Sequence, residues 1–408
     1  MILVERHIIN KKDKKYRLID EAAYKSKNLY NATLYAVRQH YFETNEYISY
    51  ARLQHIFQTE KQVDYYALPT KVAQWTMKLV DQNFKSFFKS LKQFKENPSK
   101  FKGKPKIPYY LDSVNGRYQL TYTKQAISKK ELDNKSVIKP SGLEIEIPTR
   151  LTYNDIQQVR IVRGVNYYVV EVLYKVEDVP PLDDNGKYAA IDLGVNNFVT
   201  LTTNLEHDMP LVISGKEIKS YNHWYNKELS NRKSILEKRN GTKTSKYINQ
   251  ITIKRNNKIS DFMHKSSRYI VNQLVSKGIT TLVIGKNKNW KQDTHMGKAN
   301  NQNFVQIPYN SFIDKLIYKC YLRGISVKLI DESYTSKCSF LDMESICKHD
   351  NYLGKRVHRG LYISSDGTKI NADVNGSYNI LRKCKPNAFN ANGVKGVVVH
   401  PLIIKIRN

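Results

Sequence analysis

The chain has 408 residues, 40% of them hydrophobic, which is sufficient for roughly two or three domains that each bury a core. Lysine and arginine number 67 against 37 aspartates and glutamates, which gives a formal net charge of +30 with basic residues along the whole length. Such an excess indicates a polyanionic partner, and the 29 tyrosines and 13 phenylalanines distinguish the chain from short basic tails without a core. The charge therefore predicts nucleic-acid binding but specifies no activity.

The N-terminal segment MILVERHIINKKDKKYRL lacks the apolar centre of a signal peptide, and no apolar run approaches the ~20 residues of a membrane helix. We therefore expect an intracellular protein with no membrane partner. The four cysteines, Cys320, Cys338, Cys347 and Cys384, form no CxxC pair. A disulfide framework is not expected from this spacing.

Residues 1 to 10 are predicted to form a short strand, followed by a helical region from about Asp20 to Leu91 with breaks near Asn45 and Pro69. After Pro69 the apolar residues recur at gaps of three and four, so they share one helix face. The opposite face carries Lys71, Gln74, Lys78, Lys85, Lys89 and Lys92. Solvation is the commoner explanation of a charged face, but acids are nearly absent here, which favours contact with a phosphate backbone.

A lysine-rich loop punctuated by proline, NPSKFKGKPKIPYYL at 97–111, is predicted to end the helical region. Lys102 and Lys104 in this loop are candidates for nucleic-acid contact. Short alternating runs with turn signals at 117–176 predict a small antiparallel β-domain. The polar segment VEDVPPLDDNG at 177–187 is predicted to be a linker.

The remaining segment alternates between strand and helix patterns. Its predicted elements are strands at 188–192 and 197–203, a basic helical pair at 216–277, a strand at 280–285, a helix at 308–323, a strand at 326–331, an irregular stretch, and a helix after Asp373. A hairpin followed by helix–strand alternation predicts an α/β layer.

Two acids stand where such a sheet could place metal ligands. Asp192 ends the apolar strand in AAIDLGVNNFVTLTTN, and Asp373 precedes the helical pattern in INADVNGSYNILRK. Divalent metals that assist phosphoryl chemistry prefer hard oxygen ligands, and a two-metal site needs carboxylates that converge from different elements. Each acid also has an ordinary structural explanation, as a turn former at 192 and as an N-cap at 373.

Taken together, the two segments resemble the first and third motifs of the RuvC-like nuclease domain of TnpB proteins, the transposon-encoded relatives of type V CRISPR effectors. The resemblance covers most of the chain through NFKSFFKSLK, FKGKPKIP, IDLGVNNFVTLTT, DFMHKSSRYIV, ESYTSK and ADVNGSYNILRK, which occur in the family's order. It implies a multidomain α+β fold. The expected parts are a wedge-like antiparallel β-barrel domain (1–10 and 100–180), a helical recognition domain (11–99), and an RNase H-like (RuvC) α/β nuclease domain (184–408) with a basic helical insertion (216–277) and a knuckle-like segment without CxxC (334–370).

The chain departs from the family's pattern at its second RuvC motif. That motif normally ends a strand with glutamate, whereas TTLVIGKNKNW ends its strand at Gly285. In an RNase H-like sheet the next strand, SVKLIDES, should run parallel and end on the same edge about 5 Å away. Glu332 ends that strand, so we expect it to replace the missing acid, while Asp331 should point to the opposite face. The alternative is a surface glutamate beside an inactive site.

The second departure is the family's zinc knuckle, which has paired CxxC motifs. Here Cys338, Cys347, His349 and His358 have a spacing that matches no standard tetrahedral site, so no zinc is predicted. The expected metal is Mg²⁺, held as a two-metal site by Asp192, Glu332 and Asp373.

The predicted helical pair is joined near Gly241, and apolar residues give its second helix a buried stripe. The opposite faces carry Arg232, Lys233, Lys238, Arg239, Lys254, Arg255, Lys258 and Lys265. This cationic surface would suit an RNA–DNA duplex or the single strand to be cut.

The resemblance implies an RNA-guided DNA endonuclease that cleaves next to a short adjacent motif, with the helix carrying Lys71, Gln74 and Lys78 near that motif. The implied partners are a guide RNA from the transposon end and target double-stranded DNA, bound by a monomeric ribonucleoprotein in the bacterial cytoplasm or nucleoid. An alternative is a nuclease-inactive descendant that binds DNA under RNA guidance and represses transcription. A third possibility, a transposase that joins DNA ends, uses the same carboxylate chemistry, but the match to the whole TnpB layout argues against it.

Overall fold

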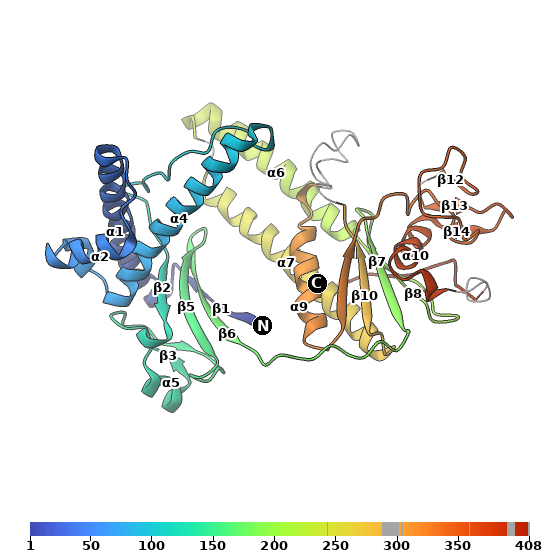
Figure 1. The fold of residues 1–408 in the computed structure, drawn as a ribbon, viewed down its shortest axis with the longest axis horizontal. Coiled ribbons are helices and arrows are strands. Elements are labelled where there is room, and N and C mark those ends of the chain that lie inside the picture. Colours follow the sequence, from blue (N-terminus) through green and yellow to red (C-terminus); the bar gives the residue numbers. More distant parts are fainter. Residues whose placement is uncertain (243, 288–301, 303–304, 359, 390–395, 407–408) are drawn as a thin grey trace. The chain divides into compact units, whose positions relative to one another are not determined.

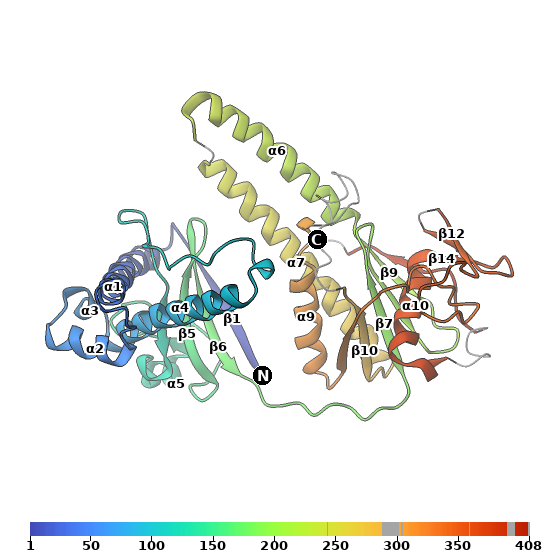
Figure 2. The same ribbon diagram turned by 45° about the horizontal axis from the view of Figure 1, so that its top comes forward.

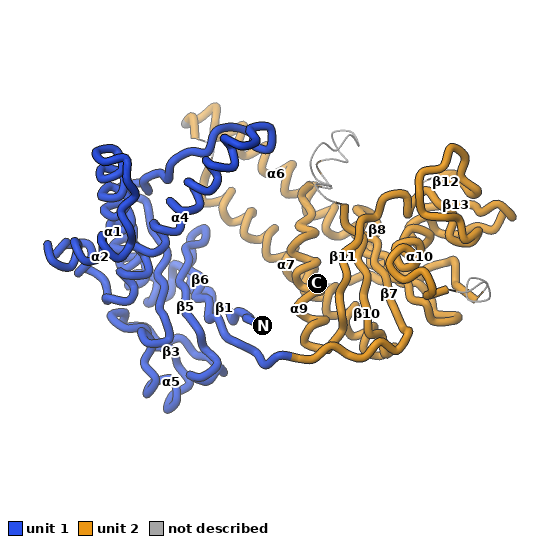
Figure 3. The backbone as a smooth tube through the Cα atoms, viewed as in Figure 1, with its two compact units in different colours: residues 1–178 blue, residues 179–408 orange. Residues whose placement is uncertain are grey.

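The computed structural model describes residues 1–242, 244–287, 302, 305–358, 360–389 and 396–406 (Figure 1). The chain divides into two compact units, Met1–Asp178 and Val179–Asn408 (Figure 3). The division falls inside the segment that the sequence predicts as a linker. Each unit has hydrophobic core residues of its own.

The first unit begins with β1 (Ile2–Asn10) and continues into helices α1 (Lys14–Thr44), α2 (Tyr50–Thr59), α3 (Val63–Tyr66) and α4 (Thr70–Glu96). The Asp13 side chain caps α1 by accepting a hydrogen bond from the backbone of Lys15. The helix ends at Asn45, whose φ of 56° lies in the left-handed region. Pro69 precedes α4, so both predicted breaks in the helical region are confirmed.

Four strands of the first unit form an antiparallel sheet. These are β1, β2 (Leu120–Thr123), β5 (Ile156–Arg163) and β6 (Tyr167–Lys175), in the order β1-β6-β5-β2. β3 (Val137–Ile138) and β4 (Ile147–Pro148) pair separately, near the short helix α5 (Lys129–Lys135). The expected antiparallel strands are therefore present, but no ladder joins the edge strands β1 and β2 among these described residues, so the pairing is an open sheet and not the closed barrel that the resemblance implies.

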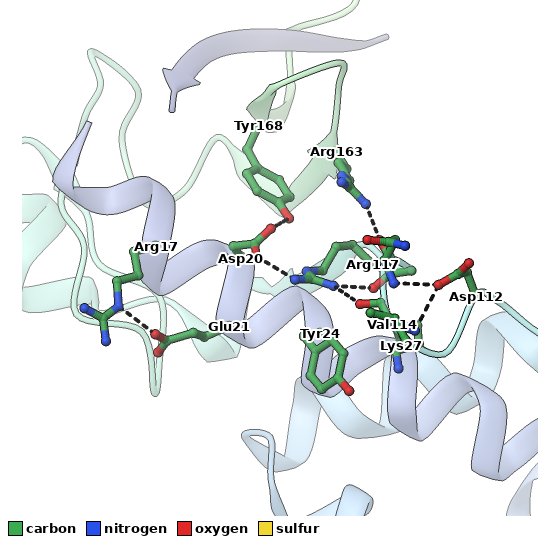
Figure 4. Close-up of polar contacts among 12 residues, drawn as sticks. Arg17, Asp20, Glu21, Tyr24, Lys27, Asp112, Val114, Arg117, Arg163 and Tyr168 are labelled. Atoms are coloured by element: carbon green, nitrogen blue, oxygen red, sulfur yellow. Dashed lines mark hydrogen bonds and ion pairs between the residues drawn. The ribbon is translucent and has the colours of Figure 1, made fainter. Parts of the chain in front are cut away.

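The helices of the first unit share one hydrophobic core with this sheet. A half-buried polar cluster adds to it, because Asp20 on α1 accepts hydrogen bonds from Arg117 at 2.8 Å and from the Tyr168 hydroxyl on β6 at 2.7 Å (Figure 4). The cluster therefore links α1 to the segment before β2 and to the sheet.

The second unit is built on a six-stranded mixed sheet in the order β11-β10-β7-β8-β9-β15. Its strands are β7 (Tyr188–Leu193), β8 (Asn197–Thr203), β9 (Leu211–Ser214), β10 (Thr281–Gly285), β11 (Ser326–Ile330) and β15 (Leu402–Ile404). The first three form an antiparallel meander, and β10 runs parallel to both β7 and β11, as the sequence predicts for the last two strands. β9 and β15 were not predicted from the sequence.

Helices cover both faces of this sheet (Figures 1 and 2). Ala189 and Ile191 face a core formed with α7 (Lys246–Ser276) and α9 (Tyr309–Tyr321). Ala190 packs with α10 (Ala372–Cys384) on the other face. This alternation follows from the two-residue period of a strand, and it places the side chain of Asp192 on the α10 side.

The predicted basic helical pair is observed as α6 (Lys216–Asn240) and α7, joined at Gly241, whose φ is 63°. The stretch predicted to be irregular contains a three-stranded sheet, β12 (Lys355–His358), β13 (Leu361–Ile363) and β14 (Lys369–Asn371). No helix in the described part of the chain is both long enough and apolar enough to cross a membrane.

Candidate functional site

The half-buried Asp192 lies at the end of β7, beneath the first turns of α10. A Cβ atom on Gly376 of α10 would stand 3.0 Å from Asp192 Oδ2. Because that contact is tighter than ordinary van der Waals packing, glycine is the residue that lets α10 approach this carboxylate. Asp192 is thus a strand residue held against a helix and not a turn former.

Asp373 lies in the first turn of α10, but it does not cap the helix. The Asn371 side chain does so, accepting hydrogen bonds from the backbone of Asp373 at 3.0 Å and of Val374 at 3.2 Å. The Asp373 carboxylate instead accepts a 2.7 Å hydrogen bond from Asn197 Nδ2 and pairs with Arg356 at 3.4 Å. Its side chain is therefore directed at neighbouring polar groups, away from its own helix terminus.

Glu332 follows β11 and reaches toward the end of β10. Its Oε2 atom lies 2.9 Å from the position that a Cβ on Gly285 would take. Asn287 holds it through two hydrogen bonds, from Asn287 Nδ2 to Glu332 Oε1 at 2.9 Å and from the Glu332 backbone N–H to Asn287 Oδ1 at 3.1 Å. The neighbouring Asp331 is exposed and bonds to Ser333 and Lys383.

The charges of Glu332 and Asp373 act on Asp192. Burial raises the pKa of Asp192 to about 8, with further contributions from the negative charges of Glu332 and Asp373, while Arg356 opposes the rise. Burial also raises the pKa of Glu332 to about 7, helped by Asp331 and opposed by Lys383. Half-buried carboxyls with raised pKa values, gathered where strands end, are typical of functional sites.

The donor set fits a hard divalent cation. Glu332 Oε2 is buried and has no hydrogen-bond partner within the described residues, so one carboxylate oxygen remains available as a ligand. All three acids offer oxygen, which Mg²⁺ prefers. Among the residues that the structure describes, no group of three or more His, Cys, Asp or Glu side chains is arranged so that it could hold a metal ion as it stands. The acids therefore need side-chain adjustment to bind one.

The cysteines of the knuckle-like segment are spread over different environments. Cys338 is buried and its thiol lies 3.6 Å from the Cys347 carbonyl, whereas Cys347 is exposed and its sulfur lies 3.4 Å from His349 Nε2. His358 ends β12 and is exposed.

The predicted nucleic-acid contacts of the first unit lie mainly at its surface. Lys71 and Lys78 are exposed on α4, and Gln74 is half-buried. Lys78 Nζ stands 5.6 Å from the Trp75 ring centre. Lys102 and Lys104 are exposed in the loop after the 3-10 turn at Pro98–Lys100.

In the second unit Arg232, Lys233 and Lys254 are exposed, and Lys258 is half-buried. Arg255, which the sequence analysis predicts to contact nucleic acid, makes hydrogen bonds inside the unit. It is half-buried, and its guanidinium donates hydrogen bonds to Asn222 on α6, to Asn256 and to the Gln306 carbonyl. Three of the five N–H donors of Arg255 are therefore engaged inside the unit, and the bond to Asn222 joins α7 to α6.

Sequence reasoning missed several polar partners of the three acids. Asn197, Asn287 and Arg356 contact Asp373 or Glu332, but only the hairpin signal around Asn197 drew attention to any of them. The aromatic partners of the basic pair were also missed. Lys254 lies 5.7 Å from the Trp224 ring centre and Arg232 lies 4.4 Å from that of Tyr247. The aromatic residues that recur along the two helices were the signal from which these contacts could have been predicted.

Two family models match the second unit and the end of the first. The model OrfB_IS605, described as "Probable transposase", matches residues 171–291, which include Asp192 and Gly285. The model described as "Cas12f1-like, TNB domain" matches residues 309–380, which include Glu332 and Asp373. The three acids are thus divided between the two matched segments, with Asp192 in the first and Glu332 and Asp373 in the second.

The chain is also similar to individual proteins. It is 24% identical over 205 residues to "TnpB-like protein ORF457" of Acidianus two-tailed virus, a match that covers 48% of this chain and 42% of the relative. Among solved structures, "Cryo-EM structure of the Cas12f1-sgRNA-target DNA complex" is 15% identical, covering 93% of this chain and 98% of that one, with a TM-score of 0.35. "Cryo-EM structure of CRISPR-Cas12f Ternary Complex" is 14% identical, covering 89% and 80%, with a TM-score of 0.36. The two family models and the TnpB-like relative together support the resemblance to TnpB proteins that the sequence motifs carry.

Proposed function

We propose that this chain is an RNA-guided DNA endonuclease of the TnpB type whose RuvC-like site uses Asp192, Glu332 and Asp373 as its acids. The observation that carries the proposal is the position of Glu332. Its Oε2 atom is buried, has no partner among the described residues, and fills the space beside Gly285 where the family's usual glutamate would begin. A carboxylate relocated by one strand thus restores an acid at the same sheet edge.

Asp192, Glu332 and Asp373 would hold the divalent ions. Mg²⁺ bound there supplies Lewis-acid polarisation of the scissile phosphate and lowers the pKa of a water nucleophile. Asn287 keeps Glu332 turned toward the β10 edge, and Asn197 does the same for Asp373 from β8. Such outer partners fix the direction of carboxylate ligands. The pKa values of Asp192 and Glu332, raised to about 8 and about 7 without metal, mean that binding a cation must displace protons from them.

The exposed basic residues of α4, the following loop, α6 and α7 would contact nucleic acid. Lys71, Lys78, Lys102, Lys104, Arg232, Lys233 and Lys254 are exposed, Gln74 and Lys258 are half-buried, and Lys254 lies beside an aromatic ring. Lysines next to aromatic rings suit a phosphate backbone with stacked bases. The resemblance to TnpB proteins favours two partners, guide RNA from the transposon end and target double-stranded DNA beside an adjacent motif.

A second candidate function is RNA-guided DNA binding without cleavage, as in a transcriptional repressor. Two observations favour it. Asp373 is already engaged by Arg356 and Asn197, and within the described residues the acids do not form a ready metal-binding group. In that case the raised pKa values of Asp192 and Glu332 would be what remains of a site that no longer cleaves DNA.

Cleavage of a plasmid that carries a matched target, by protein co-expressed with its guide RNA in Mg²⁺, decides between the two. Glu332→Ala should lower the cleavage rate on the order of 10²-fold or more, because a charge-stabilising ligand is lost. Asp331→Ala is the matched control, since the neighbouring acid is exposed and directed elsewhere, and it should keep cutting. Binding of the target by all proteins, with cleavage by none, would establish the repressor function instead.

A further inference from the structure

A basic hollow lies in the second unit on the α7–α9 side of the sheet, away from the α10 face that carries Asp192. Its volume is about 630 Å³, and α7, α9 and the residues after β15 form its walls. The charged or ionisable residues that line it are His264, Lys265, Arg268, Lys319 and Lys405. No aspartate or glutamate is among its lining residues, although Lys265 pairs with Asp261 on the turn behind it.

A smaller hollow of about 290 Å³ continues this one. The two share Arg268, Asn272, Tyr318 and Lys319, and the second adds Arg323. It too has no acidic lining residue. The shared residues make the two hollows one continuous track, called here the α7–α9 groove, and all its fixed charges are positive.

Lys319 forms the floor of the α7–α9 groove, with only 8% of its surface exposed. Its Nζ donates hydrogen bonds to the His264 carbonyl at 2.8 Å and to Ser267 Oγ at 2.7 Å. An ammonium group has three N–H donors, so one remains for a ligand. Burial, together with the positive charges of Arg268 and Lys315, lowers the pKa of Lys319 to about 8.

Arg268 makes the groove unlike an ordinary solvated surface. Exposed cations of a folded protein commonly pair with nearby acids, and Arg232 and Lys85 do so within their own helices. Arg268 has no hydrogen-bond or ion-pair partner within the described residues. A guanidinium beside a buried ammonium group lacks a counter-charge, and an anion with several oxygens would supply it.

We propose that the α7–α9 groove is a phosphate-binding site that holds the sugar–phosphate backbone of a nucleic-acid strand. Lys319 and Arg268 contact the phosphate oxygens, Lys405 and Arg323 extend the contact to either side, and the rings of Tyr269 and Tyr318 give the sugars apolar surface. The site goes beyond the proposed endonuclease function, because it uses none of the three acids, and Lys265 is the one lining residue that the sequence analysis also places in the cationic surface of the helical pair.

The test is the salt dependence of binding by the full chain in EDTA, so that cleavage plays no part. Fluorescence anisotropy would follow a labelled 20-nucleotide single-stranded RNA and a labelled 20-base-pair RNA–DNA hybrid between 50 and 200 mM NaCl. The variants are Arg268→Gln and Lys319→Met. The matched control is Lys328→Gln, which removes an equal charge from the exposed side of β11 in the same unit. Circular dichroism checks that each variant is folded.

For at least one probe, Arg268→Gln should reduce the slope of log K against log [NaCl] by about 0.7 to 0.9, the amount for one lost phosphate contact. Lys319→Met should do the same if folded, and Lys328→Gln should leave the slope at its original value. A change seen with only one probe identifies whether single strand or hybrid lies in the groove. Equal slopes for Arg268→Gln, Lys328→Gln and the unmodified chain, with both probes, would overturn the proposal while leaving the endonuclease proposal intact.

Discussion

The carboxylate of Glu332 lies where a side chain on residue 285 would have to be. A Cβ on Gly285 would stand 2.9 Å from Glu332 Oε2, and 2.6 Å from Ile380 Cδ1 on α10. β10 and β11 pair Gly285 with Ile330, so Glu332 is two residues further along and shares the face of Ile330. Glycine at 285 and glutamate at 332 are therefore sterically dependent on each other.

Gly285→Ala should disable cleavage without removing any acid. The added methyl group would collide with Glu332 Oε2 and with the Ile380 side chain, so the Glu332 carboxylate must shift from the position in which Asn287 holds it. We expect a loss of 10- to 100-fold in cleavage, about the size seen when the partners that orient a metal ligand are lost. Plasmid cleavage over a Mg²⁺ series measures it, and target binding by the same protein should be unchanged. Full activity would show that Glu332 need not occupy this position.

Exchanging the two residues provides a stronger test of the relocated acid. Gly285→Glu alone places two carboxylates in one space, and Glu332→Ala alone removes the Glu332 carboxylate from that space. The double variant restores the family's usual arrangement, with glutamate at the end of β10 and room for it beside residue 332. We expect the double variant to cleave faster than either single variant. If it stays as inactive as Glu332→Ala, position 332 does not replace position 285.

The chain's local patterns predicted most of this arrangement. Strand β8 is observed at the predicted residues 197–203, the basic helices join at Gly241 as predicted, and β10 and β11 are parallel as the placement of Glu332 requires. Those features depend on residues close in sequence, or on the rule that neighbouring parallel strands end at one edge. The domain boundaries and the roles of the site residues remain predictions.

What the sequence did not reveal depends on contacts between distant residues. Asn197 meets Asp373 across 176 residues, and Asn287 meets Glu332 across 45, so no periodicity relates them. Arg255 has the same charge as its neighbours, and only the positions of Asn222 and Gln306 show that it holds helices together. β15 pairs with β9 from the far end of the chain, so its short apolar run had no local partner to indicate a strand.

Arg356→Ala should increase the sensitivity of the site to Mg²⁺. The Arg356 guanidinium pairs with Asp373 at 3.4 Å, and its positive charge also acts on Asp192, where it lowers the pKa against the rise caused by burial. A metal ion must compete with this charge, so its removal should lower the half-maximal Mg²⁺ concentration about fivefold, as expected for ~1 kcal/mol of lost repulsion. A Mg²⁺ titration of plasmid cleavage measures the change. Lys355→Ala, its exposed neighbour on β12, is the control.

An unchanged Mg²⁺ requirement in Arg356→Ala would show that the ion pair with Asp373 is too weak to compete with metal. A lower maximal rate with the same Mg²⁺ requirement would assign Arg356 to the substrate instead. Both results test the contact between Arg356 and Asp373 independently of the position of Glu332.

Asp20→Asn should destabilise the first unit in a pH-dependent way. Burial raises the pKa of Asp20, but hydrogen bonds from Arg117 and Tyr168 outweigh it, so the net pKa lies below its usual value (Figure 4). A depressed pKa means that ionised Asp20 stabilises the fold above the unfolded value of ~3.9, and that this contribution disappears as the pH falls through the folded value. At pH 7 we expect a loss of about 1 to 3 kcal/mol, the range for a charged hydrogen bond left unmade.

Urea unfolding measures this loss, followed through Trp75 fluorescence in a chain where Trp224 and Trp290 are replaced by Phe. Glu21→Gln is the matched control, since Glu21 is the next residue on α1 and pairs with Arg17 at 2.9 Å between exposed side chains, where little stabilisation is expected. The difference in unfolding free energy between Asp20→Asn and the unmodified chain should be largest at neutral pH and shrink toward pH 3. A difference that is constant with pH would mean that the shape of the Asp20 side chain, and not its charge, links α1 to β6.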